Sequence, residues 1–174
     1  MAGTPFSMSA QKPRNDGTAL EAAVQVCTEK GVKLTAIRRE VLKILSEANQ
    51  PLGAYALLSR LQVELGRSFR PPSIYRSLET LMRVGLIERI ETRNAYVLAG
   101  NLSIPHSSLF FLCSQCNASV AVNNQDLVAL MAENASVLGF RILRPILECD
   151  GICASCSDLQ STTQNASYET VRSR

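Results

Sequence analysis

Two pairs of closely spaced cysteines give this sequence its strongest chemical signal. Cys113 and Cys116 form one Cys-x-x-Cys pair, and Cys153 and Cys156 form a second pair after 36 intervening residues. Each pair can direct two thiolates toward one point, and four thiolates form the tetrahedral cage that Zn²⁺ prefers. The spacing therefore predicts one Zn²⁺ ion per chain, bound by all four cysteines.

A metal ion with four thiolate ligands has no open coordination position, so the predicted zinc is structural and not catalytic. Its binding free energy would act as folding free energy for a small domain. The residues leave two alternatives open: iron in the same cage, or cysteines that serve a redox role or bind no metal. Cys27 and Cys149 fall outside the paired spacing, and we expect both to pack within their own elements.

The chain before residue 100 is predicted to form a winged helix-turn-helix domain over residues 18–99. Apolar residues recur at helical spacing in four segments. These segments begin near Thr18, Thr35, Ala54 and Pro71. Two apolar runs, 86–90 and 95–98, flank a polar turn and predict a β-hairpin. Helices followed by a hairpin indicate a winged helix.

The fourth predicted helix has one apolar and one polar face. Ile74, Leu78, Leu81 and Met82 are expected to face inward. The outer face is left with Ser73, Tyr75, Arg76, Ser77, Thr80 and Arg83. A helix that enters the major groove needs hydrogen-bonding and cationic side chains of this kind. In such a pose Arg76 can donate two hydrogen bonds to a guanine edge or one to a phosphate.

We therefore predict DNA contacts by Ser73, Tyr75 and Arg76. Four further arginines are candidates for phosphate contacts, which contribute affinity but do not read sequence. They are Arg38, Arg39, Arg70 and Arg93. An ordinary solvated surface charge is the alternative for each arginine taken alone.

The second half predicts a small α/β domain over residues 108–156, which makes the whole chain α+β. Strands are expected over 108–113, 120–122 and 140–148, with a helix over 124–138. The inward side of that helix is expected to carry Leu127, Leu130, Met131 and Leu138. Residues 1–17 and 157–174 are predicted to be disordered tails, and residues 100–107 a linker.

The distribution of charge and the hydropathy of the sequence indicate which partners and which compartment to expect. The first 100 residues contain 14 Lys and Arg against 9 Asp and Glu, whereas the rest contain 4 against 6. This asymmetry suggests that the front half meets a polyanion, although ordinary surface charge gives the same count. No run approaches the roughly 20 apolar residues of a membrane span, and no early stretch has the pattern of a signal peptide. We expect a cytoplasmic protein without a membrane partner, and in that compartment paired cysteines more often bind metal than form disulfides.

The order of these parts resembles the ferric uptake regulator family, and within it the zinc-uptake regulators. The matching motifs cover about residues 20–157 and are specific as an ordered set. They include Leu34-Thr35-x-x-Arg38, Ala54-Tyr55-x-Leu57-Leu58, Pro71-Pro72-Ser73-Ile74-Tyr75-Arg76, Gly85-Leu86-Ile87, His106-Ser107-Ser108-Leu109-Phe110-Phe111-Leu112-Cys113 and Gly151-Ile152-Cys153-x-x-Cys156.

The resemblance implies a homodimer in which each subunit has an N-terminal winged helix and a C-terminal dimerisation domain. It implies operator binding to double-stranded DNA and repression of metal-uptake genes when the metal is plentiful. It also implies that Tyr55 lies near the DNA.

Members of that family sense metal at a second site between the two domains, and this sequence departs from the pattern there. The matching positions are Glu88, Ala99, His106 and Ala121. His106 is kept, Glu88 is a candidate oxygen ligand, and the two alanines have no ligand atom. We therefore expect reduced or absent metal sensing. Recruitment of other ligands, such as Asp150 or Cys149, and a response to another effector are the alternatives.

Two other classes of function compete with a DNA-binding regulator. The first is a zinc-ribbon module whose winged helix binds protein instead of DNA. The second is an enzyme, and the sequence gives it little support. It has no Ser-His-Asp set, no glycine loop that would cradle phosphate and no open metal position.

Overall fold

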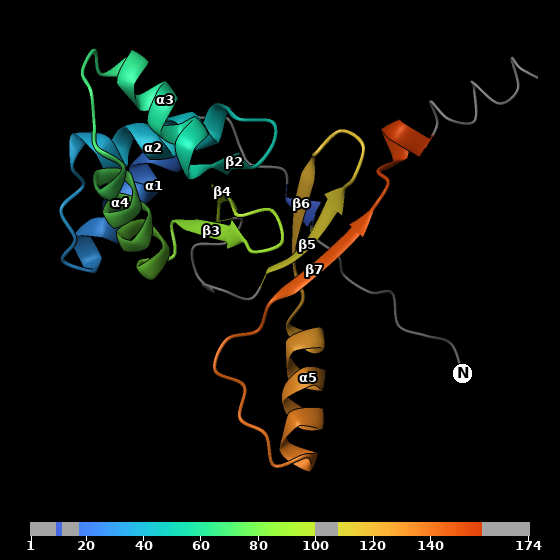
Figure 1. The fold of residues 1–174 in the computed structure, drawn as a ribbon. Coiled ribbons are helices and arrows are strands. Elements are labelled where there is room, and N and C mark those ends of the chain that lie inside the picture. The colour runs from blue at the N-terminus through green and yellow to red at the C-terminus, as the bar shows by residue number, and fades with distance from the viewer. Residues whose placement is uncertain (1–9, 12–17, 100–107, 158–174) are drawn as a thin grey trace, which may run out of the picture.

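The computed structural model describes residues 10–11, 18–99 and 108–157, which fall into two domains (Figure 1). The first contains helices α1 (Thr18–Glu29), α2 (Ala36–Glu47), α3 (Ala54–Glu64) and α4 (Pro71–Arg83). Its sheet contains β2 (Leu52–Gly53), β3 (Ile87–Ile90) and β4 (Ala95–Leu98), in the order β2-β4-β3. The predicted winged helix is confirmed.

Local signals and a shared apolar core explain these elements. The Thr35 hydroxyl accepts a hydrogen bond from the Arg38 backbone N–H at 3.4 Å and caps α2. Two prolines open α4, where their missing N–H groups need no helical partner. The helices bury one stripe each, and each buried aliphatic side chain contributes about 1.5–3 kcal/mol. The least exposed of these side chains are Val41, Leu57, Leu61, Ile74, Leu78 and Leu81.

Strand β2 was not predicted from the sequence. Leu52 pairs with Tyr96 and Gly53 pairs with Ala95, so β2 adds a third strand to the hairpin. Two residues are too few to show the alternation that identifies a strand. The hydrogen bonds to β4 therefore define this strand, and they are visible only in the folded chain.

The second domain is a four-stranded sheet in the order β1-β6-β5-β7. The antiparallel pair is β5 (Ser108–Cys113) and β6 (Ser119–Asn123). β7 (Leu147–Gly151) runs parallel to β5, with Phe111 opposite Cys149. β1 (Ala10–Gln11) pairs with β6, although no element was expected before residue 18. The unpaired backbone groups at the edge of β6 provide the reason, because they can pair with any extended segment nearby.

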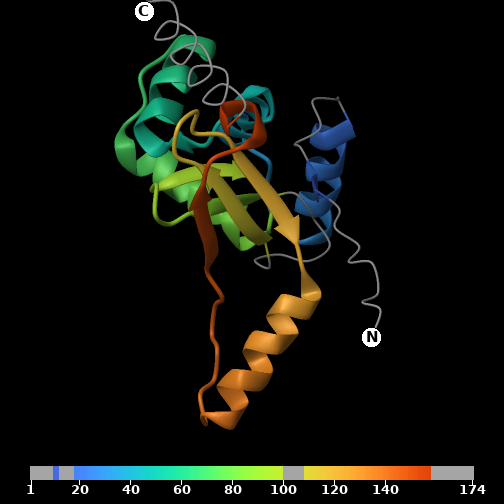
Figure 2. The same ribbon diagram turned by 90° about the vertical axis from the view of Figure 1, so that its right-hand side faces the viewer.

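Helix α5 (Gln125–Val137) follows β6 and projects away from the sheet (Figure 2). The Asn124 side chain caps it by accepting a hydrogen bond from the Leu127 N–H at 3.0 Å. The prediction that the apolar side of this helix faces inward is wrong for the single chain. Leu130 is 55% exposed and Leu138 is 82% exposed. The reason is that α5 projects from the sheet, so its own chain covers Leu127 and Met131 only in part and leaves Leu130 and Leu138 exposed.

The strand predicted over residues 140–148 is also corrected, because β7 covers 147–151 instead. The chain returns alongside α5 through residues 139–146 before it reaches the sheet. Pro145 lacks the N–H that a sheet ladder needs, so the alternating apolar residues before it do not form a strand.

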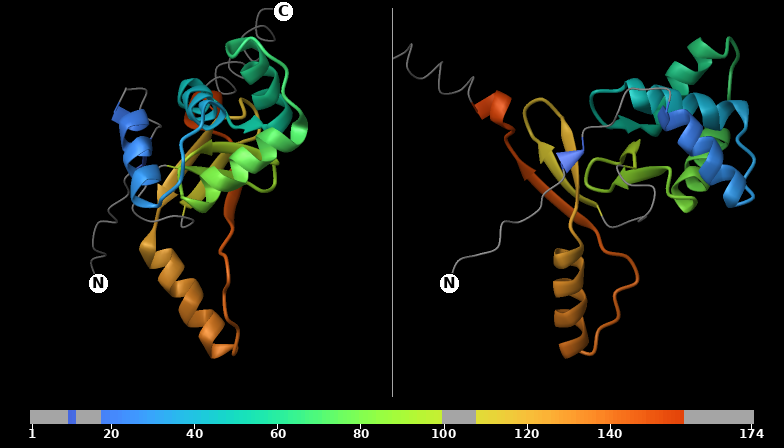
Figure 3. Two further views of the ribbon diagram at one scale, coloured as in Figure 1. Left: turned by 90° about the vertical axis from the view of Figure 1, so that its left-hand side faces the viewer. Right: turned by 180° about the vertical axis from the view of Figure 1, so that it is seen from behind.

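The two domains meet at the β3–β4 hairpin, which lies between the helices and the second sheet (Figure 3). One face of the hairpin packs into the first core through Ile87 and Tyr96. Ile90, on the other face, packs with Phe110 and Leu112 of β5. None of the described helices is long and apolar enough to cross a membrane.

Candidate metal centre and nucleic-acid interface

Parallel pairing of β5 and β7 brings the two cysteine pairs together. Cys113 ends β5 opposite Gly151, and Cys153 follows two residues later. The four thiol sulfurs lie within 4.8 Å of one another, and Cys116 Sγ is 3.7 Å from Cys153 Sγ. Zn–S bonds of about 2.3 Å in a tetrahedron place sulfurs roughly 3.8 Å apart. The predicted cluster therefore forms, with spacings that fit a tetrahedral thiolate-bound ion.

Backbone hydrogen bonds prepare the first thiolate of the cluster. N–H groups of Cys116, Cys153 and Gln115 point toward the Cys113 sulfur and lower the pKa of that thiol to about 6. Asn117, with φ of 58°, gives the turn its left-handed residue. Hydrogen bonds to the Cys153 and Cys116 sulfurs, together with burial, raise the pKa of Cys156 to about 12. A bound cation is what would let all four sulfurs be thiolates together.

The two remaining cysteines lie away from the cluster. Cys27 is buried in the first core, as predicted, and burial raises the pKa of its thiol. Cys149 lies in β7, but its side chain is exposed instead of packed. Within the part of the chain that the structure describes, the four paired cysteines are the only His, Cys, Asp or Glu group arranged to hold a metal.

Three of the four positions matched to a sensory site are described, and His106 lies outside the described residues. Glu88 is a buried residue of β3, opposite Val97. Ala99 donates its N–H to the Leu86 carbonyl. Ala121 lies in β6 and packs against the Ile90, Phe110 and Leu112 cluster. Apolar contacts between the domains therefore occupy the place of one expected ligand.

The outer face of α4 presents the predicted DNA-contacting side chains. Tyr75 and Arg76 are exposed, Ser73 is half-buried, and Arg70 is exposed at the position that precedes the helix. Ser77 is a correction, because it is buried and not on the outer face. Its hydroxyl donates to the Ser73 carbonyl at 2.9 Å, which allows the small side chain to face the core.

Two other residues predicted to contact DNA, Tyr55 and Arg38, differ in exposure and in their contacts within the chain. Tyr55, the second residue of α3, is 70% exposed. Arg38 is half-buried, and its guanidinium donates to the Lys33 carbonyl at 2.6 Å and to the Thr80 hydroxyl at 3.0 Å. Thr80 in turn donates to the Arg76 carbonyl at 2.8 Å. Arg38 thus braces α2 against α4, whereas its neighbour Arg39 is exposed.

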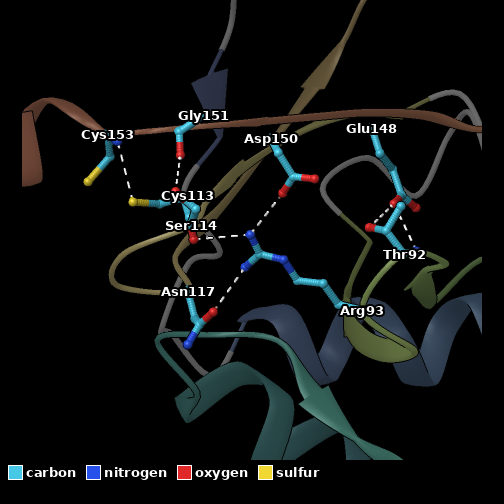
Figure 4. Close-up of polar contacts among 9 residues, drawn as sticks. All are labelled: Thr92, Arg93, Cys113, Ser114, Asn117, Glu148, Asp150, Gly151 and Cys153. Carbon is cyan, nitrogen blue, oxygen red and sulfur yellow. Dashed lines mark hydrogen bonds and ion pairs between the residues drawn. The ribbon is translucent and has the colours of Figure 1, made fainter.

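Arg93 of the hairpin turn points toward the second domain (Figure 4). Its guanidinium donates to the Cys113 carbonyl at 3.0 Å and to the Asn117 side chain at 3.4 Å. It also forms an ion pair with Asp150 at 3.2 Å, and the side chain is 19% exposed. These contacts inside the chain leave the expected phosphate contact by Arg93 without structural support.

The sequence did not predict the residues of the second domain that bind the hairpin turn. The Glu148 carboxylate accepts hydrogen bonds from Glu91 and Thr92, and Arg144 forms an ion pair with Glu91 at 2.6 Å. These partners are more than 50 residues apart in the sequence, and each taken alone is an ordinary polar or charged residue. No local pattern could have identified them.

Comparison with known proteins gives a consistent result. The model of the ferric uptake regulator family matches residues 29–149. The zinc uptake regulation protein of Escherichia coli (strain K12) is 32% identical over 143 residues, which cover 82% of this chain and 83% of that protein. A solved zinc uptake regulator complexed with zinc and DNA has a TM-score of 0.78 at 30% identity, covering 83% of this chain and 96% of that one.

The crystal structure of holo XcZur has a TM-score of 0.75 at 33% identity, covering 83% of this chain and 99% of that one. The family match spans both the winged helix and most of the second domain. This chain therefore belongs to the ferric uptake regulator family.

Proposed function

We propose that this chain is a cytoplasmic, homodimeric transcription regulator that binds specific double-stranded DNA sequences. It contains one structural Zn²⁺ per subunit and represses genes for metal uptake, with weakened or lost metal sensing. The exposed Tyr75 and Arg76 on α4 of a winged helix carry this proposal. Membership of a regulator family supports it and argues against an enzyme.

Zn²⁺ is the metal that fits the cysteine cluster best. Four thiolate sulfurs favour a soft or borderline ion, and the sulfur spacing agrees with Zn–S bonds in a tetrahedron. A resolved complex of a related zinc uptake regulator holds zinc and DNA together. The residues of the cluster, Cys113, Cys116, Cys153 and Cys156, would stabilise the fold and leave no position for a substrate.

The uncovered side of α5 and the segment after it support a homodimer. Large apolar side chains are exposed along this region of the single chain. They are Leu130, Val137, Leu138, Phe140, Leu143 and Ile146. Several large exposed apolar side chains in one region are typical of a protein interface, and a second copy of the chain is the occupant proposed here.

DNA binding is proposed to use α4 for base contacts. Residues near the N-terminus of a recognition helix contact base edges, and Ser73, Tyr75 and Arg76 lie there. Arg39 and Arg70 are exposed and free for phosphate, and Tyr55 is exposed at the start of α3. In a symmetric dimer, two copies of α4 would read two half-sites.

Arg76→Ala tests DNA recognition. The variant should bind the preferred DNA sequence 1–3 kcal/mol more weakly, or roughly 5- to 150-fold, and should discriminate less between bases. The preferred sequence is first selected from random duplexes with the wild-type protein, and affinities are then measured at one fixed salt concentration.

Arg83→Ala is the matched control, because Arg83 is exposed on the last turn of the same helix. It should change base discrimination little. If wild type selects no sequence, the chain is instead a protein-interaction module. If both variants bind the selected sequence like wild type, Arg76 does not read its bases.

Mild chelation tests the proposed loss of sensing. Ala99 and Ala121 offer no ligand atoms, so no second metal ion should be needed for DNA binding. We expect one zinc per subunit by elemental analysis, and unchanged DNA affinity after dialysis against a chelator too weak to remove thiolate-bound zinc. Two metal ions per subunit, with DNA binding lost on dialysis, would contradict this expectation.

A further inference from the structure

One carboxylate of the second domain, that of Glu148, contacts two residues of the hairpin turn, which covers residues 91–94. Glu148 Oε1 accepts a hydrogen bond from the Glu91 backbone N–H at 2.6 Å. Glu148 Oε2 accepts hydrogen bonds from the Thr92 N–H at 3.0 Å and from the Thr92 hydroxyl. Hydrogen bonds to an ionised acceptor are the stronger kind, so this carboxylate is well placed to fix the turn.

Glu148 is in its charged form at neutral pH. Burial alone would raise the pKa of this carboxyl, but the hydrogen bonds from Thr92 and Glu91 outweigh it, with a smaller contribution from the Arg93 charge. The net effect is a pKa below the ordinary value. Hydrogen bonds to the charged form favour that form, and the same interaction favours the docked turn.

A second set of contacts between the turn and the second domain involves the side chains of Arg93 and Glu91. The Arg93 guanidinium reaches the Cys113 carbonyl and the Asp150 carboxylate, both next to the metal cluster (Figure 4). Arg144, before β7, forms an ion pair with the Glu91 side chain. Contacts from the second domain therefore bind the turn at three successive residues, Glu91, Thr92 and Arg93.

The hairpin is rigidly connected to the recognition helix. Val84 and Leu86, which link α4 to β3, are buried in the first core. The Leu86 N–H donates to the Leu81 carbonyl at 3.0 Å, so no flexible segment separates the helix from the strand. A restraint on the turn thus acts on the orientation of α4.

We propose that Glu148 and Arg93 are positioning residues for DNA binding, which fix the orientation of α4 on the second domain without a metal ion between the domains. This inference rests on the proposed DNA-binding function. In a dimer, the orientation of the two recognition helices sets the half-site spacing that they can reach. The apolar contact of Ile90 with Phe110 and Leu112 joins the same two domains.

Glu148→Ala in the full-length, zinc-loaded protein tests this inference. Without DNA, amide exchange at Glu91 and Thr92 should accelerate at least tenfold, and small-angle scattering should show a larger radius of gyration. Zinc content should stay at one per chain. DNA affinity should fall on the order of tenfold, because the binding-competent arrangement is then only part of the population.

Glu47→Ala is the matched control, because Glu47 is an exposed carboxylate at the last residue of α2 and takes part in none of the interdomain contacts described above. It removes the same charge and should change none of these measurements. Arg93→Gln is the second variant, to be used if Glu148→Ala does not fold, and it should show the same loosening. Because scattering and exchange are measured without DNA, loss of a phosphate contact cannot mimic the effect.

If scattering and amide exchange of both variants matched the wild type, Glu148 and Arg93 would not fix the domain arrangement, even if the wild-type protein binds specific DNA. A wild-type protein that binds no DNA would overturn the positioning role and the proposed function together. In that case, a looser domain arrangement in the variants would show that the contacts of Glu148 and Arg93 are structural only.

Discussion

Replacement of Cys153 by serine is expected to remove the metal from the second domain and to unfold that domain. Structural zinc in zinc-finger peptides binds with about 10–16 kcal/mol of apparent free energy, which matches or exceeds the roughly 5–15 kcal/mol stability of a whole domain. The second domain has few fully buried residues of its own. Phe110 and Leu112 form its described buried cluster together with Ile90, which belongs to the first domain.

The position of Cys153 makes the effect large. Its sulfur is 3.7 Å from Cys116 Sγ, and its backbone N–H donates to Cys113 Sγ at 3.4 Å. It therefore connects the end of β7 to the turn after β5. Without the metal, those two strand ends would keep the ladder pairing of β5 with β7 and the Ser114 hydrogen bonds to the Gly151 carbonyl, but nothing would hold the two Cys-x-x-Cys turns at the cluster.

Three measurements check this expectation. Elemental analysis should fall from one zinc per chain to none, the dimer should dissociate in analytical ultracentrifugation, and amide protection in β5 and β7 should be lost. The winged helix has a separate core and should keep its protected amides. Cys149→Ser is the matched control, since Cys149 is exposed and outside the cluster, and it should behave as wild type. A metal-free Cys153→Ser protein that kept its dimer and its protected sheet would contradict the structural role.

The parts of the fold that sequence predicts are those determined by neighbours along the chain. Each helix of the first domain carries its own apolar stripe, and Thr35 and Asn124 act as caps within three residues of their partners. The cysteine cluster belongs to the same class, because each Cys-x-x-Cys turn has a definite local geometry. For these features a short window of residues contains most of the physical information.

The features that sequence did not predict depend on contacts between distant segments. β7 is identified by its parallel pairing with β5, and the more apolar segment before it is not a strand. The outward side of α5 has an apolar pattern that reads as an inner face, although its own chain leaves it uncovered. Glu148 and Arg93 have no local signal at all, because each acquires its role from a residue in the other domain.

Ile90 and Ile87 offer a direct comparison between the interdomain contact and the first core. Both are fully buried residues of β3. They are three positions apart, so their side chains lie on opposite faces of the strand. Ile87 packs with the helices of the first domain, whereas Ile90 packs with Phe110 and Leu112 of the second. The same substitution in one strand can therefore test two different contacts.

Each isoleucine-to-alanine variant should lose about 2–5 kcal/mol of unfolding free energy, because both leave a cavity in packed surroundings. Denaturant unfolding followed by circular dichroism measures this loss. Only Ile90→Ala should also alter small-angle scattering of the folded, DNA-free protein and weaken DNA binding, because its cavity lies between the domains. If Ile87→Ala altered the scattering as much as Ile90→Ala, the apolar contact would not determine the domain arrangement. If neither variant altered it, the polar contacts of Glu148 and Arg93 would be sufficient to hold α4, since they remain intact in both.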